Sequence, residues 1–257
     1  MNKPIAIIAG EPNSISSEII FKSWKLRKRY NHKLLFIIGS IQLLNLQKKK
    51  LKFKIKIKKI DNSFQINDLK GSELPVYNID YTQNKSFEKI SSKSNKYIFK
   101  CFQTAINLAK SKKIIGFINC PISKEFLFKN RHQGITEFLA KKYGKKNSEV
   151  MLIYNKKLSV SPITTHIPIN HVSKKINKFR ILNNVKIINN FYKEVFNKKP
   201  NIAILGLNPH NFSPSKKFDE KKIISNAIKN LLRLKIRVSG PIVPDTSFII
   251  FKKYKFD

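Results

Sequence analysis

Short runs of apolar residues alternate with longer amphipathic stretches, and this order limits the fold more than any other feature of the sequence. The run IAIIAG (5–10) has the length of a buried strand, and the stretch 16–29 carries apolar residues at helical spacing. A second such pair follows at 32–40 and 41–49. Strands that alternate with helices are typical of an α/β protein with a mostly parallel sheet. We therefore expect an α/β fold.

The same alternation continues along the chain, with one long polar interruption. The polar stretch 81–96 is the expected loop or lobe boundary, and the last segment, 240–257, is expected to form a turn, a loop and a short helix. The length of 257 residues fits roughly one or two domains. Further strands are expected at 53–60, 114–120, 149–155, 158–166 and 201–208, and helices at 86–110, 123–130, 135–144, 171–197 and 218–235.

The formal net charge of +37 first suggests a nucleic-acid or anionic-membrane partner. That interpretation requires clustered cations, whereas Lys residues occur along the whole chain, for example at 23–30, 48–59 and 197–201. Lys, Asn, Ile and Phe are all abundant, as the codons of an AT-rich genome favour. We therefore expect no nucleic-acid partner and keep a basic nucleic-acid-binding protein only as a weaker alternative.

The two cysteines and the apolar runs indicate the compartment. Cys101 and Cys120 show neither the spacing of metal ligands nor a disulfide framework, and Cys101 falls in a helical pattern that predicts a core position. No apolar run approaches the roughly 18 residues that span a bilayer, and the N-terminus is not that of a signal peptide. We expect a cytoplasmic protein without a membrane partner.

Four expected strands end in polar turns: GEPNS (10–14), NCPISK (119–124), TTHIPI (164–169) and GLNPHN (206–211). In open α/β sheets, ligands bind beyond the carboxyl ends of the strands. His166 and His210 hold corresponding places in two of these turns, and a pair of imidazoles suits a divalent metal such as Zn, Co or Ni. The alternative is that each is a hydrogen-bonded cap, and a metal site also needs a third ligand.

Other polar side chains occupy predicted helix starts. Thr136 and Glu137 begin a helix, where a hydroxyl and free amides can hold a phosphate or carboxylate, or simply cap the helix. Asp245 stands out because the chain has only 15 acidic residues; it either binds substrate or caps Thr246 and Ser247. Weaker phosphate candidates, for which capping or a solvent-exposed position is the alternative, are Ser14, Ser16, Ser17 and Lys124.

The motifs IAGEP, NCPISKEFLF, GITEFLA, TTHIPI, LGLNPH and GPIVPDTSF together resemble, in this order, the 4-hydroxythreonine-4-phosphate dehydrogenase family of the pyridoxal phosphate pathway. The resemblance implies a two-lobed α/β fold like that of isocitrate and isopropylmalate dehydrogenases, with mostly parallel sheets and helices on both faces, working as a homodimer. It implies that His166 and His210 coordinate a divalent metal (Zn, Co or Mg) and that Thr136 holds substrate. Asp245 is our second substrate-binding candidate, whereas catalytic and cofactor-binding residues stay unassigned.

The resemblance also implies a reaction. The family oxidises the 3-hydroxyl of 4-phosphohydroxythreonine, a small phosphorylated amino acid, with NAD, and the metal polarises the alcohol oxygen. The resulting β-keto acid loses carbon dioxide to give 3-amino-2-oxopropyl phosphate, a step in pyridoxine 5'-phosphate biosynthesis.

Three departures from the family pattern lower the expected activity. Ile135 replaces the His of the G-H-T-E motif, and the segment 211–220 lacks the expected Gly and Glu. The chain ends at Asp257, before the Y-H-D-Q motif that carries the third metal His. We expect 1–257 to be a single two-lobed unit that lacks the C-terminal segment of the family, and we do not expect this chain as given to turn over. An inactive homologue that serves as a scaffold is the alternative.

Overall fold

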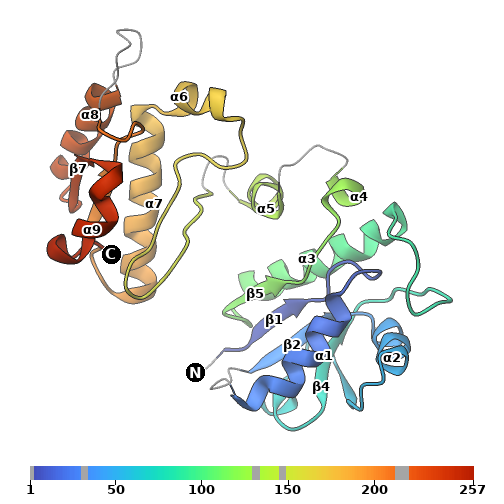
Figure 1. Ribbon diagram of the computed structural model, residues 1–257. Coiled ribbons are helices and arrows are strands. Elements are labelled where there is room, and N and C mark those ends of the chain that lie inside the picture. Colours follow the sequence, from blue (N-terminus) through green and yellow to red (C-terminus); the bar gives the residue numbers. More distant parts are fainter. Residues whose placement is uncertain (1–2, 30–33, 129–133, 145–148, 212–219) are drawn as a thin grey trace. The chain divides into compact units, whose positions relative to one another are not determined.

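The structure is a computed structural model that describes residues 3–29, 34–128, 134–144, 149–211 and 220–257 (Figure 1). The chain divides into two units, residues 1–132 and 133–257. The polar stretch 81–96 is a loop as far as residue 91, as one of its two expected interpretations had it, but it is not a lobe boundary. That stretch belongs to the first unit because Asn13 Oδ1 accepts hydrogen bonds from Glu88 N at 2.8 Å and from Gln83 Nε2 at 2.9 Å.

The first unit contains a five-stranded, fully parallel sheet in the order β3-β4-β2-β1-β5. Four of its strands confirm expected runs. The remaining strand, β4, was not expected from the sequence, yet it pairs with both β2 and β3. The strands are β1 (Ile5–Ile8), β2 (Leu35–Gly39), β3 (Ile57–Ile60), β4 (Leu74–Asn78) and β5 (Gly116–Asn119).

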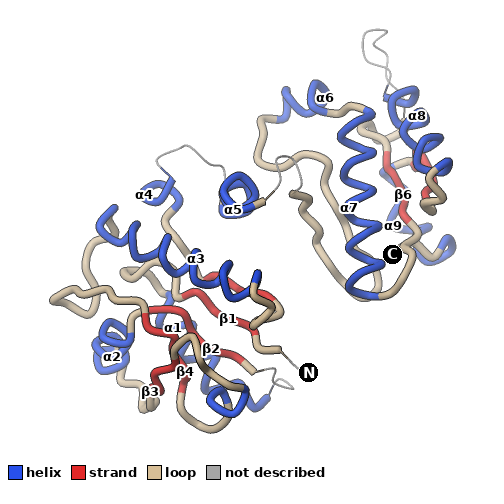
Figure 2. The backbone as a smooth tube through the Cα atoms, turned by 180° about the vertical axis from the view of Figure 1, so that it is seen from behind, coloured by secondary structure: helices blue, strands red, loops and turns tan. Residues whose placement is uncertain are grey.

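Helices cover both faces of this sheet, as Figures 1 and 2 show for α1 and α3. Phe21 and Trp24 of α1 pack against Ile37 and Val76 on one face. On α3, Cys101 is fully buried with its neighbours, which confirms its core position. A sheet buried on both faces explains the near-continuous apolar strands. The helices are α1 (Ser16–Leu26), α2 (Ile41–Lys50), α3 (Asn95–Lys110) and α4 (Lys124–Phe128), with short 3-10 turns η1 (Arg27–Arg29), η2 (Ile66–Leu69) and η3 (Ser92–Ser94).

The second unit has a parallel pair of strands, β6 (Ile202–Leu205) and β7 (Val238–Ile242). Its core joins Val185 of α7 to Leu231 of α8 and Val238 of β7. The expected strands at 149–155 and 158–166 meet in a single antiparallel bridge between Ile153 and Val160. The helices are α5 (Ile135–Tyr143), α6 (Val172–Lys175), α7 (Lys178–Phe196), α8 (Glu220–Arg233) and α9 (Pro244–Tyr254), with a 3-10 turn η4 (Ile169–His171).

The expected strands at 149–155 and 158–166 are absent apart from a single antiparallel bridge, and two further expected elements of this unit differ from the structure. The expected helix at 171–197 is divided because Ile176 is extended and Asn177 caps α7, accepting a hydrogen bond from Arg180 N at 2.9 Å. At 240–257 the expected short helix is present as the 11-residue helix α9, whereas the expected turn and loop before it are the end of β7. Among the described residues, no helix combines the length and apolar character that crossing a bilayer requires.

Candidate functional site

The turn after β6 is fixed by a buried carboxylate. Glu220, at the start of α8, is only 1% exposed. Its oxygens accept hydrogen bonds from the backbone N–H of Leu207 at 3.2 Å and of Asn208 at 3.2 and 3.3 Å. Gly206 N donates to Ile242 O of β7 at 3.0 Å. A carboxylate in the first turn of a helix also complements the helix dipole. These contacts fix the backbone just before His210.

Asn211 fixes the other side of the same turn. Its backbone is left-handed (φ 56°), and its Nδ2 donates to Pro241 O at 3.1 Å. A Cβ on Gly206 would lie 1.7 Å from Asn211 Oδ1, so any larger residue there would displace the Asn211 side chain. His210 lies between these anchors, with its side chain 80% exposed. The turn therefore presents the imidazole to solvent on a restrained backbone.

His210 and Asp245 are the two predicted site residues that the structure brings together. His210 Nδ1 lies 3.7 Å from Asp245 Oδ2, and the Asp245 side chain is half exposed in the first turn of α9. Ser247 Oγ donates to Pro244 O at 2.8 Å. An exposed imidazole nitrogen and a carboxylate oxygen at this distance can share a cation or hold one another in orientation.

His166 and Thr136 are both exposed, and neither is bonded to His210 or Asp245 in the described part of the chain. His166 has a left-handed backbone (φ 55°), a conformation that costs roughly 1–3 kcal/mol and occurs often at functional sites. Thr136 lies in the first turn of α5. Among the described residues, no hydrogen bond or ion pair joins either residue to His210 or Asp245, and no three His, Cys, Asp or Glu side chains form a metal-sized group. The donor types therefore suit a divalent cation, but the described part of the chain does not assemble a full ligand set.

The serines after β1 have structural roles. Ser14 Oγ donates to Glu11 O at 2.8 Å and accepts the N–H of Ser16 at 3.2 Å, so Ser14 supports the start of α1. Ser16 and Ser17 are both 3% exposed, which leaves them out of reach of a phosphate in solvent. Lys124, at the start of the five-residue helix α4, is exposed.

Glu11 is a buried carboxylate that the sequence analysis missed. It is 1% exposed and accepts hydrogen bonds from Ser94 Oγ at 3.0 and 3.2 Å. Burial raises the pKa of the Glu11 carboxyl, and the Ser94 hydroxyl opposes part of that rise. Gly10 has φ +75°, and a Cβ there would lie 2.5 Å from Pro121 O. The signal in the sequence was the rarity of acidic residues, which makes one beside a strand end noteworthy.

Comparison with solved structures identifies the class of fold. All of this chain matches 78% of a 4-hydroxythreonine-4-phosphate dehydrogenase from Klebsiella pneumoniae, with a TM-score of 0.85 and 24% sequence identity. The chain thus has the two-unit α/β fold of that class, as expected.

Sequence comparison identifies the family. The family model "Pyridoxal phosphate biosynthetic protein PdxA" matches residues 31–257, and the chain belongs to this family. A 4-hydroxythreonine-4-phosphate dehydrogenase from Sulfurihydrogenibium sp. is 34% identical over 97% of this chain and 77% of its own length. A D-threonate 4-phosphate dehydrogenase from Salmonella typhimurium is 28% identical over 99% of this chain and 79% of its own length. Both relatives are named as dehydrogenases of small phosphorylated acids.

Proposed function

We propose that this protein is an NAD-dependent, metal-dependent dehydrogenase that oxidises 4-phosphohydroxythreonine in pyridoxine 5'-phosphate biosynthesis, acting in the cytoplasm. The observation that carries the proposal is the 34% identity to a 4-hydroxythreonine-4-phosphate dehydrogenase over 97% of the chain. The exposed pair of His210, on the restrained turn after β6, and Asp245, on α9, supports it, with 3.7 Å between His210 Nδ1 and Asp245 Oδ2.

The chain's own residues have separable roles in this proposal. His166 and His210 would hold a divalent cation of the Zn, Co or Mg type through imidazole nitrogen, together with further ligands that the described residues do not supply. When bound, the cation supplies polarisation of the hydroxyl oxygen, and NAD supplies the hydride acceptor. Asp245 restrains the His210 ring. The Thr136 hydroxyl and the free N–H groups of the first turn of α5 would bind the phosphate or carboxylate of the substrate.

The proposed reaction has two steps, an oxidation and a decarboxylation. The bond between C3 and its hydrogen breaks with transfer of a hydride, and the hydroxyl proton is released to leave a ketone. This ketone is β to the substrate carboxylate, so the carboxylate carbon then leaves as carbon dioxide. The electron pair of the broken bond forms an enolate, which takes up a proton on carbon to give 3-amino-2-oxopropyl phosphate.

We also propose that the protein forms a homodimer through an apolar surface on the second unit. Exposed apolar side chains gather on the 151–160 hairpin and the end of α7, where Tyr154 stacks on Phe196 with ring centroids 5.0 Å apart. Ile153 is 56% exposed and Val195 58% exposed. Apolar patches of this kind mark protein interfaces. Analytical ultracentrifugation of wild type and Val195→Glu tests this surface: a dimer that the substitution dissociates supports it, and a wild-type monomer contradicts it.

The central experiment measures nicotinamide reduction by the purified protein with 4-phosphohydroxythreonine, and separately with D-threonate 4-phosphate, using NAD and NADP. Chelator treatment followed by Zn, Co or Mg tests the metal requirement. NAD reduction with 4-phosphohydroxythreonine that the chelator abolishes would support the proposal. We expect His210→Ala to weaken metal binding by about 100-fold, and His171→Ala, a change of another exposed histidine, to leave it unchanged.

Three other outcomes would count against the proposal. Preference for D-threonate 4-phosphate would transfer the assignment to that substrate. Metal binding without turnover of either compound would favour the inactive scaffold. Turnover that survives removal of all divalent metal would overturn the metal requirement.

A further inference from the structure

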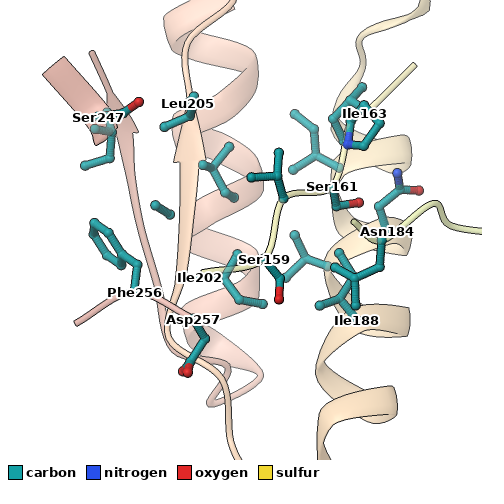
Figure 3. Close-up of a pocket in the computed structure, with 18 of the residues that line it drawn as sticks. Ser159, Ser161, Ile163, Asn184, Ile188, Ile202, Leu205, Ser247, Phe256 and Asp257 are labelled. Atoms are coloured by element: carbon teal, nitrogen blue, oxygen red, sulfur yellow. The ribbon is translucent and has the colours of Figure 1, made fainter. Parts of the chain in front are cut away.

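An apolar cavity of about 420 Å³ lies within the second unit, beside β6 (Figure 3). One wall is β6 and the turn that follows it, and another is the extended segment 158–164. Helices α7 and α9 complete the lining. We call this cavity the β6 slot.

One edge of β6 faces the β6 slot with its backbone groups. Ile202 N donates to Arg237 O and Gly206 N donates to Ile242 O, both at 3.0 Å, so these residues point toward β7. Because backbone groups alternate along a strand, the N–H and C=O of Ala203 and Leu205 point to the opposite edge. Among the described residues, the sheet of the second unit consists of β6 and β7, so no strand covers this edge.

The segment 158–164 also turns backbone groups toward the β6 slot. Val160 exchanges two backbone hydrogen bonds with Ile153, at 2.8 and 2.9 Å, so its own groups face the hairpin. The neighbouring Ser159 and Ser161, which line the cavity, therefore direct their N–H and C=O away from the hairpin. Pro162, which has no N–H, falls on the hairpin side by the same alternation. Tyr192 Oη hydrogen-bonds Ser159 Oγ at 3.0 Å and holds this wall on α7.

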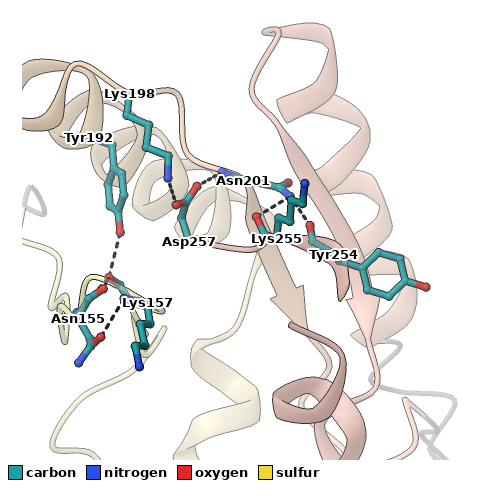
Figure 4. A network of polar contacts seen from close by, with 9 residues as sticks. Asn155, Lys157, Tyr192, Lys198, Asn201, Tyr254, Lys255 and Asp257 are labelled. Atoms are coloured by element: carbon teal, nitrogen blue, oxygen red, sulfur yellow. Dashed lines mark hydrogen bonds and ion pairs between the residues drawn. The ribbon is translucent and has the colours of Figure 1, made fainter. Parts of the chain in front are cut away.

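One end of the β6 slot shows how a polypeptide contacts this edge. Asp257 N donates to Asn201 O at 3.1 Å, and Asn201 N donates to Asp257 Oδ2 at 3.0 Å (Figure 4). Lys198 pairs with the same carboxylate. Asn201, the residue before β6, falls on the same edge as Ala203 and Leu205 by this alternation. Its backbone C=O and N–H pair with the main chain and the side-chain carboxylate of Asp257.

We propose that the β6 slot binds an extended, apolar polypeptide strand of about five residues, roughly 17 Å long, which pairs with β6 on one side and with Ser159–Ser161 on the other. A peptide strand can hydrogen-bond to the backbone groups of β6 on one side and of Ser159–Ser161 on the other, whereas a hydrocarbon ligand cannot. Its side chains pack on apolar residues of the two helices. It also enlarges a two-stranded sheet, which is marginal by itself. The lining side chains are Ile181, Val185 and Ile188 of α7 and Phe248 and Phe251 of α9.

The probe is a fluorescein-labelled peptide of five alternating Val and Ile residues, flanked by paired Glu residues because the chain carries a net charge of +37. Anisotropy measures binding, and amide exchange by NMR locates it. We expect the peptide to slow exchange at Ala203 and Leu205 by about tenfold or more. Ile204 and Gly206, which face β7, should change less. A version N-methylated at alternate residues should bind at least about tenfold more weakly.

Two variants test whether the peptide binds in the β6 slot or elsewhere on the surface. Ile188→Lys places a charge in the β6 slot and should weaken peptide binding by more than about tenfold. Ile169→Lys, at a side chain that is 90% exposed and outside the lining, should leave it unchanged. If Ile188→Lys fails to fold, the exchange pattern and the N-methylated peptide still decide the question. The proposal is overturned by absent binding, by binding that leaves Ala203 and Leu205 unprotected, by equal protection with decanoate, or by self-association that protects these amides without peptide.

Discussion

Both carboxylate oxygens of Glu220 accept the backbone N–H of Asn208, at 3.3 and 3.2 Å. This contact ties the first turn of α8 to the turn that carries His210. The position of the exposed imidazole therefore depends on a buried group that never reaches solvent.

Glu220→Gln should destabilise the second unit. The substitution removes the charge that strengthens these hydrogen bonds and turns a donor toward backbone N–H groups, which costs about 1–3 kcal/mol of unfolding free energy. Urea denaturation followed by circular dichroism measures the loss. Glu194→Gln, an exposed change on α7, is the matched control. Equal stability of the two variants would show that the Glu220 contacts contribute nothing.

Gly206→Ala should destabilise the protein by about 1–3 kcal/mol. The new Cβ would lie 1.7 Å from Asn211 Oδ1, so the Asn211 side chain must move and lose its hydrogen bond to Pro241 O. Gly116→Ala is the control, because a Cβ there meets nothing within 4 Å. Thermal unfolding compares the two. In an Asn211→Ala background the Gly206→Ala change should cost less, and a cost that stays the same would contradict the steric explanation.

The stability that Glu11 contributes should fall as pH rises. Burial raises the pKa of its carboxyl in the folded protein above the ordinary value of 4.5. The protonated form is therefore favoured by folding, and its contribution is complete below pH 4.5 and lost as pH rises through the folded pKa. The difference in unfolding free energy between wild type and Glu11→Gln should therefore decline as pH rises above 4.5. Urea denaturation at a series of pH values measures it.

Ser94→Ala tests the same site by removing the hydroxyl that donates to the Glu11 carboxylate. The Ser94 hydroxyl donates to the ionised carboxylate, so its loss should move the decline to higher pH. A difference between wild type and Glu11→Gln that is constant with pH would contradict this account.

Both cysteines should resist alkylation in the folded protein. Burial raises the pKa of the Cys101 thiol to about 12 and of the Cys120 thiol to about 11, so little reactive thiolate exists near neutral pH. Mass spectrometry after iodoacetamide treatment should show both thiols unmodified without urea and both modified in urea. Rapid labelling of Cys101 in the native protein would show that α3 opens readily.

The order of elements and several local details could be predicted from the sequence. The apolar runs at 5–10 and 32–40 became β1 and β2, because buried parallel strands need continuous apolar residues. Cys101 lies in the core as its helical spacing indicated. In contrast, β4 was missed: it is short, contains Pro75, and becomes a strand because β2 and β3 provide partners on both sides.

Part of the candidate site could also be anticipated. His210 was chosen for its residue type and its place at a strand end, and Asp245 because acidic residues are rare in the chain, and the two lie together. The support beneath them was not anticipated, because a carboxylate such as Glu220 gives no sign in the sequence of which backbone N–H it will accept.

The sequence by itself determined the alternation of strands and helices, the family, and the residue types available for chemistry, since these depend on local periodicity and on the order of motifs. Only the tertiary structure decided that Glu220 holds the turn before His210, that 81–96 belongs to the first unit, and that no strand within the described residues pairs with the second edge of β6. Those facts depend on contacts between residues far apart in the chain. Such contacts form only where packing brings the backbone groups within hydrogen-bonding distance.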